Sequence, residues 1–445
     1  MAMQQYLDRY AESESACSLD AAGTYDHVLC IPAYAESPGF LDQLTANIRG
    51  SNALVILIVN APADADPGAL ATTQALAGTL VKMYPAKSVI ADDMVLLNGP
   101  GRLDLLLIQH CRPGRFLDKK GGVGLARKIA CDIACKLVSK GQIASPWIYT
   151  TDADAVLPAD YFDGVTGLDP NTVSAGLYPF LHTQNSNKDA SLAQQLYDQS
   201  MAYYVAGLSY AGSAWAFHTI GSTLVINAAH YAQARGFPKR QAGEDFYLLN
   251  KLGKIGRIAC LDTSPLTLES RLSDRVPFGT GPALQKILLL DDPARDFVFY
   301  HPACFVALKV WLELAESLWS GGIKALTVDD IDNVLGEKPG EFASVDTRVL
   351  YDCLQSLEVN DALDHAFSHS KSKAVFDRHL HNWFDAFRTL KFIHWLRDNH
   401  YPSLPLQVIQ TDKTLPLAVD FSAYAPGPPA WILPPRISHP GRQQG

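Results

Sequence analysis

The chain has 445 residues, 48% hydrophobic and 19% charged, which is enough for two or three domains and excludes a disordered or fibrous protein. A formal net charge of −9 argues against a broad basic surface for nucleic acid or anionic lipid, and favours a small-molecule substrate. We expect no signal peptide and no membrane helix, and the eight scattered cysteines, without a CxxC pair, favour the cytoplasm.

Short apolar runs without polar alternation recur from the N-terminus onward. Each run is too short for a helix and suits a strand that is buried on both faces. The runs read HVLCIPAY, ALVILIV, LDLLLIQ, WIYTT and TVSAGLY. Amphipathic segments lie between them, one after Pro38 and another after Gly122. This alternation predicts an α/β sheet.

Polar side chains follow three of the predicted strands. The first strand leads into residues 32–36, the second ends at Asn60, and the WIYTT strand leads into Asp152 and Asp154. Ligands of α/β sheets collect at the carboxyl ends of the strands. We therefore expect these three segments to open on one crevice.

The segment KKGGVGLARKIACDIA places glycines at the start of a predicted helix, with Lys119, Lys120 and Arg127 nearby. Glycines let backbone N–H groups approach a phosphate, and the cations add attraction. The alternative is a glycine-rich helix start that binds no ligand.

The segment TTDADAVLPADYF ends an apolar strand with two carboxylates, Asp152 and Asp154. In an extended chain alternate side chains point the same way, so both are expected to reach one cation. Oxygen ligands suit Mg²⁺ or Mn²⁺. The alternative is a solvated turn that caps a helix.

The segment GEDFYLLNKLGKIGRIACLD begins an amphipathic helix with Glu244 and Asp245, and a strand-like run follows. Carboxylates in the first turn of a helix are favoured by its dipole, so simple capping is the alternative to a catalytic role.

The segment SRLSDRVPFGTGP combines Arg271 and Arg275 with glycines. This composition is typical of a loop that clamps phosphates. The alternative is a pair of surface arginines beside a turn.

From about Val298 the pattern changes to helical segments such as VALKVWLELAESLW and WFDAFRTLKFIHWL, followed by a strand-like LQVIQ and a tail rich in proline and glycine. The expected organisation is an N-terminal extension over 1–24, an α/β domain over 25–297, a mainly helical domain over 298–421 and a tail over 422–445.

Four of these motifs together resemble the family 2 glycosyltransferases with the GT-A fold. They are IPAYAE, GVGLARK, DADA, and the acidic pair that follows Gly236 and Phe237, and the resemblance covers about residues 26–262. It implies a Rossmann-like nucleotide-sugar-binding sheet, a UDP- or GDP-sugar donor, a hydroxyl acceptor, and Mn²⁺ or Mg²⁺. A QxxRW motif is absent from the sequence, so a single transfer is expected rather than processive synthesis.

The resemblance also implies residue roles. Tyr34 would lie against the nucleobase, Asp152 and Asp154 would bind the metal, and Asp245 would deprotonate the acceptor in an inverting displacement. His301 is the candidate third metal ligand, with His182 and His218 as rivals. The other candidates are Glu244 for catalysis and, for donor binding, Pro32, Glu36, Asn60, Lys120, Arg127, Arg271 and Arg275. Ala35 departs from the family, which has asparagine at this position.

Three alternatives stay open at this stage. Two are enzymes on similar sheets, a retaining glycosyltransferase and a sugar-nucleotide pyrophosphorylase; Glu244 and Asp245 argue against both. The third is a carbohydrate-binding or scaffold protein with a degenerate site, which the intact DADA and acidic pair disfavour. The sequence is compatible with a homo-oligomer.

Overall fold

The computed structural model describes residues 2–18, 23–183, 187–270, 279–420 and 436–438. The chain divides into two units, one formed by 1–185 with 219–282 and the other by 186–218 with 283–445. The division differs from the expected domains 25–297 and 298–421, because residues 186–218 and 283–297 belong to the second unit.

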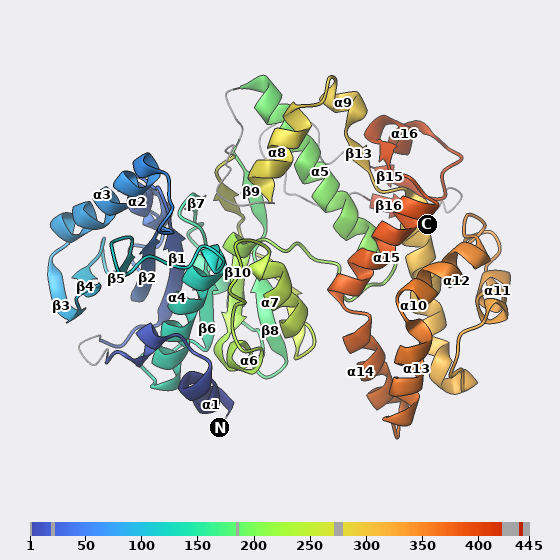
Figure 1. The fold of residues 1–445 in the computed structure, drawn as a ribbon, viewed down its shortest axis with the longest axis horizontal. Coiled ribbons are helices and arrows are strands. Elements are labelled where there is room, and N and C mark those ends of the chain that lie inside the picture. Colours follow the sequence, from blue (N-terminus) through green and yellow to red (C-terminus); the bar gives the residue numbers. More distant parts are fainter. Residues whose placement is uncertain (1, 19–22, 184–186, 271–278, 421–435, 439–445) are drawn as a thin grey trace. The chain divides into compact units, whose positions relative to one another are not determined.

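A nine-stranded mixed sheet forms the centre of the first unit (Figure 1), with the strand order β11-β8-β10-β6-β1-β2-β5-β4-β3. Its strands are β1 (His27–Ala33), β2 (Ala53–Asn60), β3 (Ala86–Ala91), β4 (Met94–Asn98), β5 (Asp104–His110), β6 (Trp147–Thr150), β8 (Val173–Leu177), β10 (Leu224–Asn227) and β11 (Arg257–Cys260). All five apolar runs form strands, which confirms the α/β prediction. The neighbours β6, β1, β2 and β5 are parallel.

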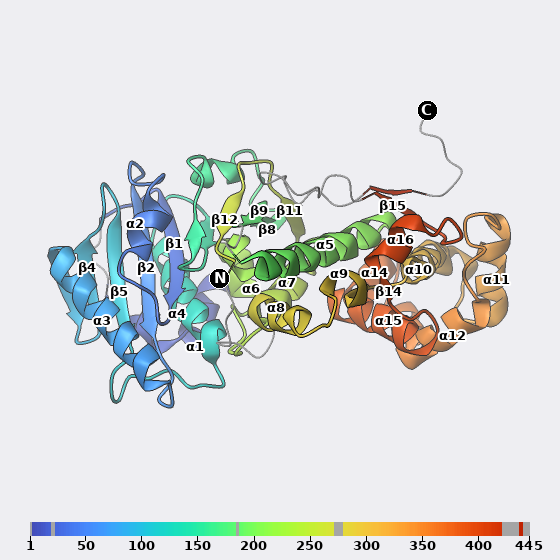
Figure 2. The same cartoon turned by 90° about the horizontal axis from the view of Figure 1, so that it is seen from above.

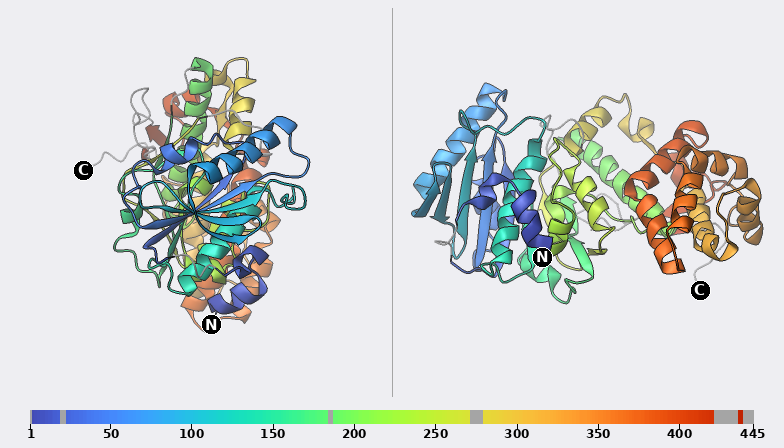
Figure 3. Two further views of the ribbon diagram at one scale, coloured as in Figure 1. Left: turned by 90° about the vertical axis from the view of Figure 1, so that its left-hand side faces the viewer. Right: turned by 60° about the horizontal axis from the view of Figure 1, so that its bottom comes forward.

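The connections between the parallel strands run in two opposite directions along the sheet, and the direction changes at β1. The chain moves from β1 to β2 and on to β5 in one direction along the sheet, then returns from β5 to β6 through α4. Because crossovers between parallel strands are right-handed, a reversal of direction puts the helices on opposite faces. Figure 3 shows this arrangement, with α3 and α4 on either side of the twisted strands. The switch point therefore lies between β1 and β6, where α/β sheets bind ligands.

The helices of the first unit cover the sheet and one another. They are α1 (Ala2–Arg9), α2 (Phe40–Thr45), α3 (Pro67–Met83), α4 (Gly122–Ser139), α6 (Ala228–Gln233) and α7 (Glu244–Leu252), with 3₁₀ turns η1 (Ser13–Ala16), η2 (Tyr161–Val165) and η3 (Gly221–Thr223). The expected N-terminal extension is an integral part of this unit, because α1 packs on α4 and α6 and buries Tyr6.

A small second sheet lies in the same unit. It contains β7 (Ala155–Val156), β9 (Phe180–His182) and β12 (Leu266–Leu268), with β12 in the middle. The backbone N–H of Glu269, just after β12, donates to the carbonyl oxygen of Asp154 at 3.2 Å. This sheet therefore supports the turn that follows β6.

The second unit is mainly helical. Its elements are α5 (Lys188–Tyr210), α8 (Thr280–Leu288), α9 (Pro293–Asp296), β13 (Val298–Phe299), α10 (Pro302–Gly321), α11 (Val328–Glu337), α12 (Thr347–Ser356), α13 (Val359–Ser368), α14 (Lys373–Trp383), α15 (Ala386–Asn399), β14 (Leu404–Pro405), α16 (Leu406–Thr411), β15 (Ala418–Asp420) and β16 (Arg436–Ser438). Figure 2 shows the long helix α5 beside α8, and Leu196 of α5 packs with Leu284 and Ile287 of α8.

The core of the second unit gathers around α10. Trp311 and Phe305 of α10 are fully buried, and Tyr203 of α5 packs edge-on against Phe305. The strand expected at LQVIQ is wrong, because this run forms the short helix α16, in which Ile409 is the buried residue. In the parts of the chain that the structure describes, no helix combines the length and the hydrophobicity that a transmembrane segment requires.

Candidate active site

The carboxyl end of β1 turns sharply. Ala35 has a φ of 54°, in the left-handed region that non-glycine residues seldom adopt, and its N–H donates to the Thr73 hydroxyl of α3 at 3.0 Å. Tyr34 is partly exposed beside this turn, Pro32 is buried within β1, and Glu36 is buried. The turn thus holds the predicted nucleotide-binding segment against α3.

Asn60 closes β2 at the same edge of the sheet. Its side-chain oxygen is buried and has no hydrogen-bond partner among the described residues. A buried acceptor without a hydrogen-bond donor lowers the stability of the fold. This oxygen is therefore suited to accept a hydrogen bond from an N–H group of a ligand.

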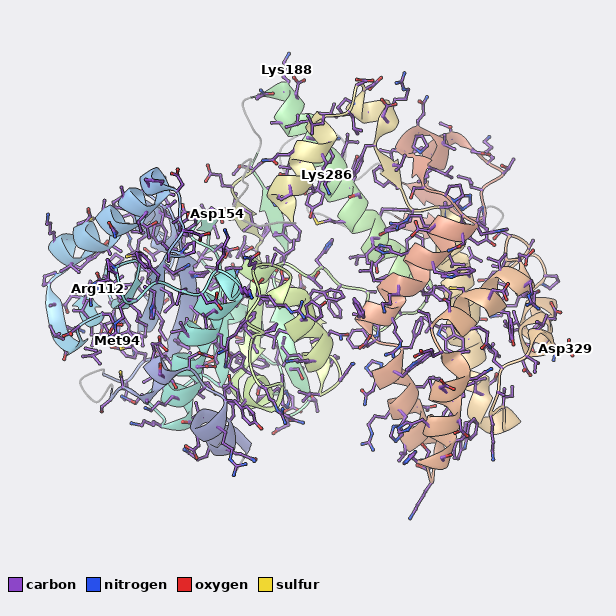
Figure 4. The ribbon with its side chains drawn as sticks, in the orientation of Figure 1. Met94, Arg112, Asp154, Lys188, Lys286 and Asp329 are labelled. Atoms are coloured by element: carbon purple, nitrogen blue, oxygen red, sulfur yellow. The ribbon has the colours of Figure 1, made fainter. Side chains whose placement is uncertain are left out.

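Asp152 and Asp154 follow β6 in a turn. The N–H of Ala155 donates to the carbonyl oxygen of Asp152 at 3.2 Å, so the extended geometry that was expected to align the two carboxylates is absent. Asp154 lies next to β7 (Figure 4), and both side chains keep some exposure. The two carboxylates share one turn at the switch point.

Arg127 on α4 joins this turn to the start of α7. Its Nη2 lies 2.5 Å from Asp152 Oδ1, its Nε lies 3.0 Å from Glu244 Oε1, and its Nη1 donates to the Thr150 hydroxyl at 2.9 Å. Arg127 is only 2% exposed. Burial acts to lower the pKa of Arg127, but the charges of Asp152 and Glu244 outweigh it and raise that pKa.

Two residues of this cluster were not predicted from the sequence. One is Thr150, the last residue of β6, which accepts from Arg127. The other is Gly221, where a Cβ would lie 2.7 Å from Arg127 Nη2, so a side chain there would displace the guanidinium. Thr150 begins the TTDADA segment, but its role depends on its distance from Arg127, and Gly221 belongs to none of the motifs described above.

Glu244 and Asp245 begin α7 after Gly243, whose φ of 71° turns the chain into the helix. Glu244 is 4% exposed and burial raises its pKa, against the lowering influence of Arg127. Burial, and then the charge of Glu244, raise the pKa of Asp245 to about 7. A carboxylate with a pKa near neutrality is suited to act as a general base.

The glycines at the start of α4 have a structural explanation. A Cβ at Gly124 would lie 2.4 Å from the Pro238 carbonyl oxygen, and one at Gly122 would lie 2.4 Å from the Gln241 Cα. The Gly124 N–H also donates to the Arg240 carbonyl oxygen at 3.0 Å. These glycines let the loop before α7 approach α4, and the predicted phosphate contact stays a prediction.

The predicted cations have different surroundings. Lys120 is exposed, and neighbouring Lys119 forms an exposed ion pair with Asp64. Arg127 gives all three of its nitrogens to protein oxygens, as described above. Arg271 and Arg275 lie outside the described residues.

The three histidine candidates lie in different parts of the chain. His301 belongs to the second unit, where its Nδ1 accepts the Ala303 N–H and caps α10, and its ring lies 5.5 Å from that of Tyr401. His218 belongs to the same unit, and burial lowers its pKa to about 4. His182 ends β9 in the first unit. The helix cap gives His301 a structural role, and its metal role stays a prediction.

The acidic turn offers few protein ligands to a divalent metal. Within the described ranges, no group of three or more His, Cys, Asp or Glu side chains is placed to hold a metal, and Arg127 already contacts one oxygen of Asp152. Mg²⁺ and Mn²⁺ sites often use one or two carboxylates and take their other ligands from water and substrate phosphates. The turn therefore fits a cation that arrives with a diphosphate, and does not fit a cation enclosed by protein alone.

No protein-family model matches this sequence, and no curated protein shows significant similarity to it.

Proposed function

We propose that this chain is a metal-dependent glycosyltransferase with a GT-A-type sheet, which transfers a sugar from a UDP- or GDP-sugar to a hydroxyl acceptor. The observation that carries the proposal is the convergence of Asp152 and Glu244 on Arg127. This contact brings an acidic turn at the switch point together with the helix start that carries Asp245.

The positions of the other residues agree with a nucleotide-sugar donor. Asn60, with its buried side-chain oxygen, is the last residue of β2, and the partly exposed Tyr34 follows the neighbouring parallel strand β1. An amide acceptor beside an aromatic ring suits a nucleobase, which has N–H groups on its edge and a π face. We assign the base of the donor to these two residues.

The chemistry assigned to the chain is a single displacement. Asp245 takes the proton of the acceptor hydroxyl, the hydroxyl oxygen bonds to the anomeric carbon, and the bond from that carbon to the diphosphate oxygen breaks. Asp154, with Asp152, would hold Mn²⁺ or Mg²⁺, which would neutralise charge on the departing nucleoside diphosphate. One such displacement inverts the anomeric centre.

Donor binding is the first test. Thermal shift and calorimetry with UDP- and GDP-sugars, with Mn²⁺, Mg²⁺ or EDTA, should reveal one donor that stabilises the fold only with metal. Asp154→Ala should abolish that binding, whereas Asp329→Ala, an exposed carboxylate on α11, should preserve it. Metal-dependent binding that survives in Asp154→Ala would contradict the assignment of the acidic turn.

The base is the second test. Asp245→Asn keeps the shape of the side chain and removes its basicity, so donor binding should persist while transfer falls by roughly 10²- to 10⁴-fold. Nuclear magnetic resonance of the first-formed product should show inversion at the anomeric carbon. Near-normal transfer by Asp245→Asn would refute the base assignment, and a retained configuration would refute the single displacement.

A further inference from the structure

We propose that Arg127 is a positioning residue, whose guanidinium sets the distance between the acidic turn after β6 and the base at the start of α7. Its expected effect on transfer rests on the proposed function. Its structural effect can be measured on the chain alone.

The geometry of Arg127 is that of a three-way clamp. Its nitrogens donate to Thr150 and Asp152 on the β6 side and to Glu244 on the α7 side. Thr150 is the last residue of a central strand and fully buried, so it gives the guanidinium a rigid support. The clamp therefore ties α7 to the sheet through one side chain.

A second contact joins α4, the helix that carries Arg127, to the loop before α7. The Gly124 N–H donates to the Arg240 carbonyl oxygen, and the glycine Cα allows this close approach. Backbone contact fixes the loop before α7, and Arg127 fixes the first residue of the helix. Asp245 is the residue after Glu244. Because Arg127 holds Glu244 in place, it also fixes the position of the Asp245 carboxylate.

The clamp requires arginine rather than any cation. A guanidinium is planar and presents its donors in a fixed fork, whereas a lysine ammonium is a point charge on a flexible stem. Gly221 leaves room for the flat group at Nη2. Arg127→Lys thus keeps one positive charge and removes the simultaneous contact with three oxygens.

The kinetic test uses Arg127→Lys. Displacement of a reacting group by about 1 Å costs on the order of 100-fold in rate, so kcat should fall by about ten- to a hundredfold while the donor Kd changes less. Tyr6→Phe is the matched control, because Tyr6 contacts Lys128 and Asp132 of the same helix α4. It should lower the melting temperature and leave kcat unchanged.

A double-mutant cycle identifies the group through which Arg127 acts. In an Asp245→Asn background, Arg127→Lys should cause little further loss of kcat, because the base that it positions is already gone. Fully additive losses would overturn the inference, since Arg127 would then act on the donor and not through Asp245.

Hydrogen exchange tests the clamp without a substrate. Arg127→Lys should speed amide exchange of Ala155, in the acidic turn, and of Tyr247, whose N–H donates to the Gly243 carbonyl oxygen. Tyr6→Phe should leave both amides unchanged. Unaltered exchange at both amides in Arg127→Lys would overturn the positioning role, whereas failure of the wild-type chain to bind any nucleotide sugar would refute only the glycosyltransferase proposal.

Discussion

Helix α4 buries two successive cations in unlike surroundings. Lys128 Nζ lies 2.8 Å from Asp132 Oδ2 and 2.7 Å from the Tyr6 hydroxyl, and Tyr231 donates to the same carboxylate. Asp132 is fully buried. Lys128 also lies 3.9 Å from Glu12, whose carboxylate pairs with Lys239 at 2.8 Å, so two cations and two carboxylates balance each other in this cluster.

The cluster around Arg127 is not balanced in this way. One guanidinium contacts the carboxylates of Asp152 and Glu244, and the charge of Asp245 also acts on it. The Asp152 side chain keeps 38% of its exposure. Two charged clusters on one helix therefore differ in what they can do: the closed cluster, whose charges balance, stabilises the fold, and the open cluster, with its excess of carboxylates, can receive a cation.

The largest expected effect concerns Lys128. Lys128→Met leaves the Asp132 carboxylate buried without its cation, which should lower the free energy of unfolding by about 3–5 kcal/mol. Denaturant unfolding measures this loss. A fall in kcat of the folded Lys128→Met variant as large as that expected for Arg127→Lys would show that the two clusters do not have separate roles.

The raised pKa of Asp245 should make kcat/KM and stability depend on pH in opposite directions. With the pKa of Asp245 raised to about 7, the ionised base is lost below neutrality, and kcat/KM should fall by about tenfold per pH unit there. Stability should respond in the opposite direction. Between about pH 4 and 7 the folded chain holds a proton that the unfolded chain has released, so this group's contribution decreases as pH rises.

The measurement for this prediction is a pair of pH profiles, one of kcat/KM and one of the melting temperature. Asp245→Asn should remove this group's contribution from the melting profile. An unchanged melting profile in that variant would show that Asp245 has an ordinary pKa.

A smaller effect is expected at the contact between α4 and the loop before α7. Gly124→Ala places a Cβ 2.4 Å from the Pro238 carbonyl oxygen, and such overpacking costs about 1–3 kcal/mol. Gly78→Ala in α3 is the control, because nothing lies within 4 Å of its Cβ position. Alanine should stabilise α3 there by about 0.5–1 kcal/mol. Equal melting temperatures for both variants would contradict the close approach.

An effect of similar size is expected at the Tyr6 hydroxyl, which contacts the closed pair. Tyr6→Phe removes a hydroxyl that donates to Asp132 and accepts from Lys128, and because both partners are charged, stability should fall by about 1.5–3 kcal/mol. Chemical denaturation of the two proteins measures it. A change in the pH profile of kcat/KM would contradict the separation of the two clusters.

The apolar strands were predictable because both faces of a central sheet are buried. Such strands need continuous apolar runs, and HVLCIPAY and ALVILIV are runs of this kind. The hairpin of β3 and β4 was not predicted from the sequence. The residues of β3 are exposed or only partly buried and its register with β4 is irregular, so β3 has no continuous apolar run. The acidic residues could be named in advance, and Arg127 could be named as a cation. The partners of Arg127 could not be predicted. Its contact with Glu244 depends on the close packing of the α4 glycines against residues 238–241, which are distant in the sequence.

The excursion of residues 186–218 out of the first unit has a consequence during synthesis. Tyr203 of α5 belongs to the same core as Phe305, yet all of residues 219–282, which complete the first unit, are translated between them. Because domains fold as units and N-terminal ones first on the ribosome, the first unit can close while α5 still lacks its core. The apolar side chains of α5 therefore cannot be buried in their own core until α8 and α10 have been synthesised.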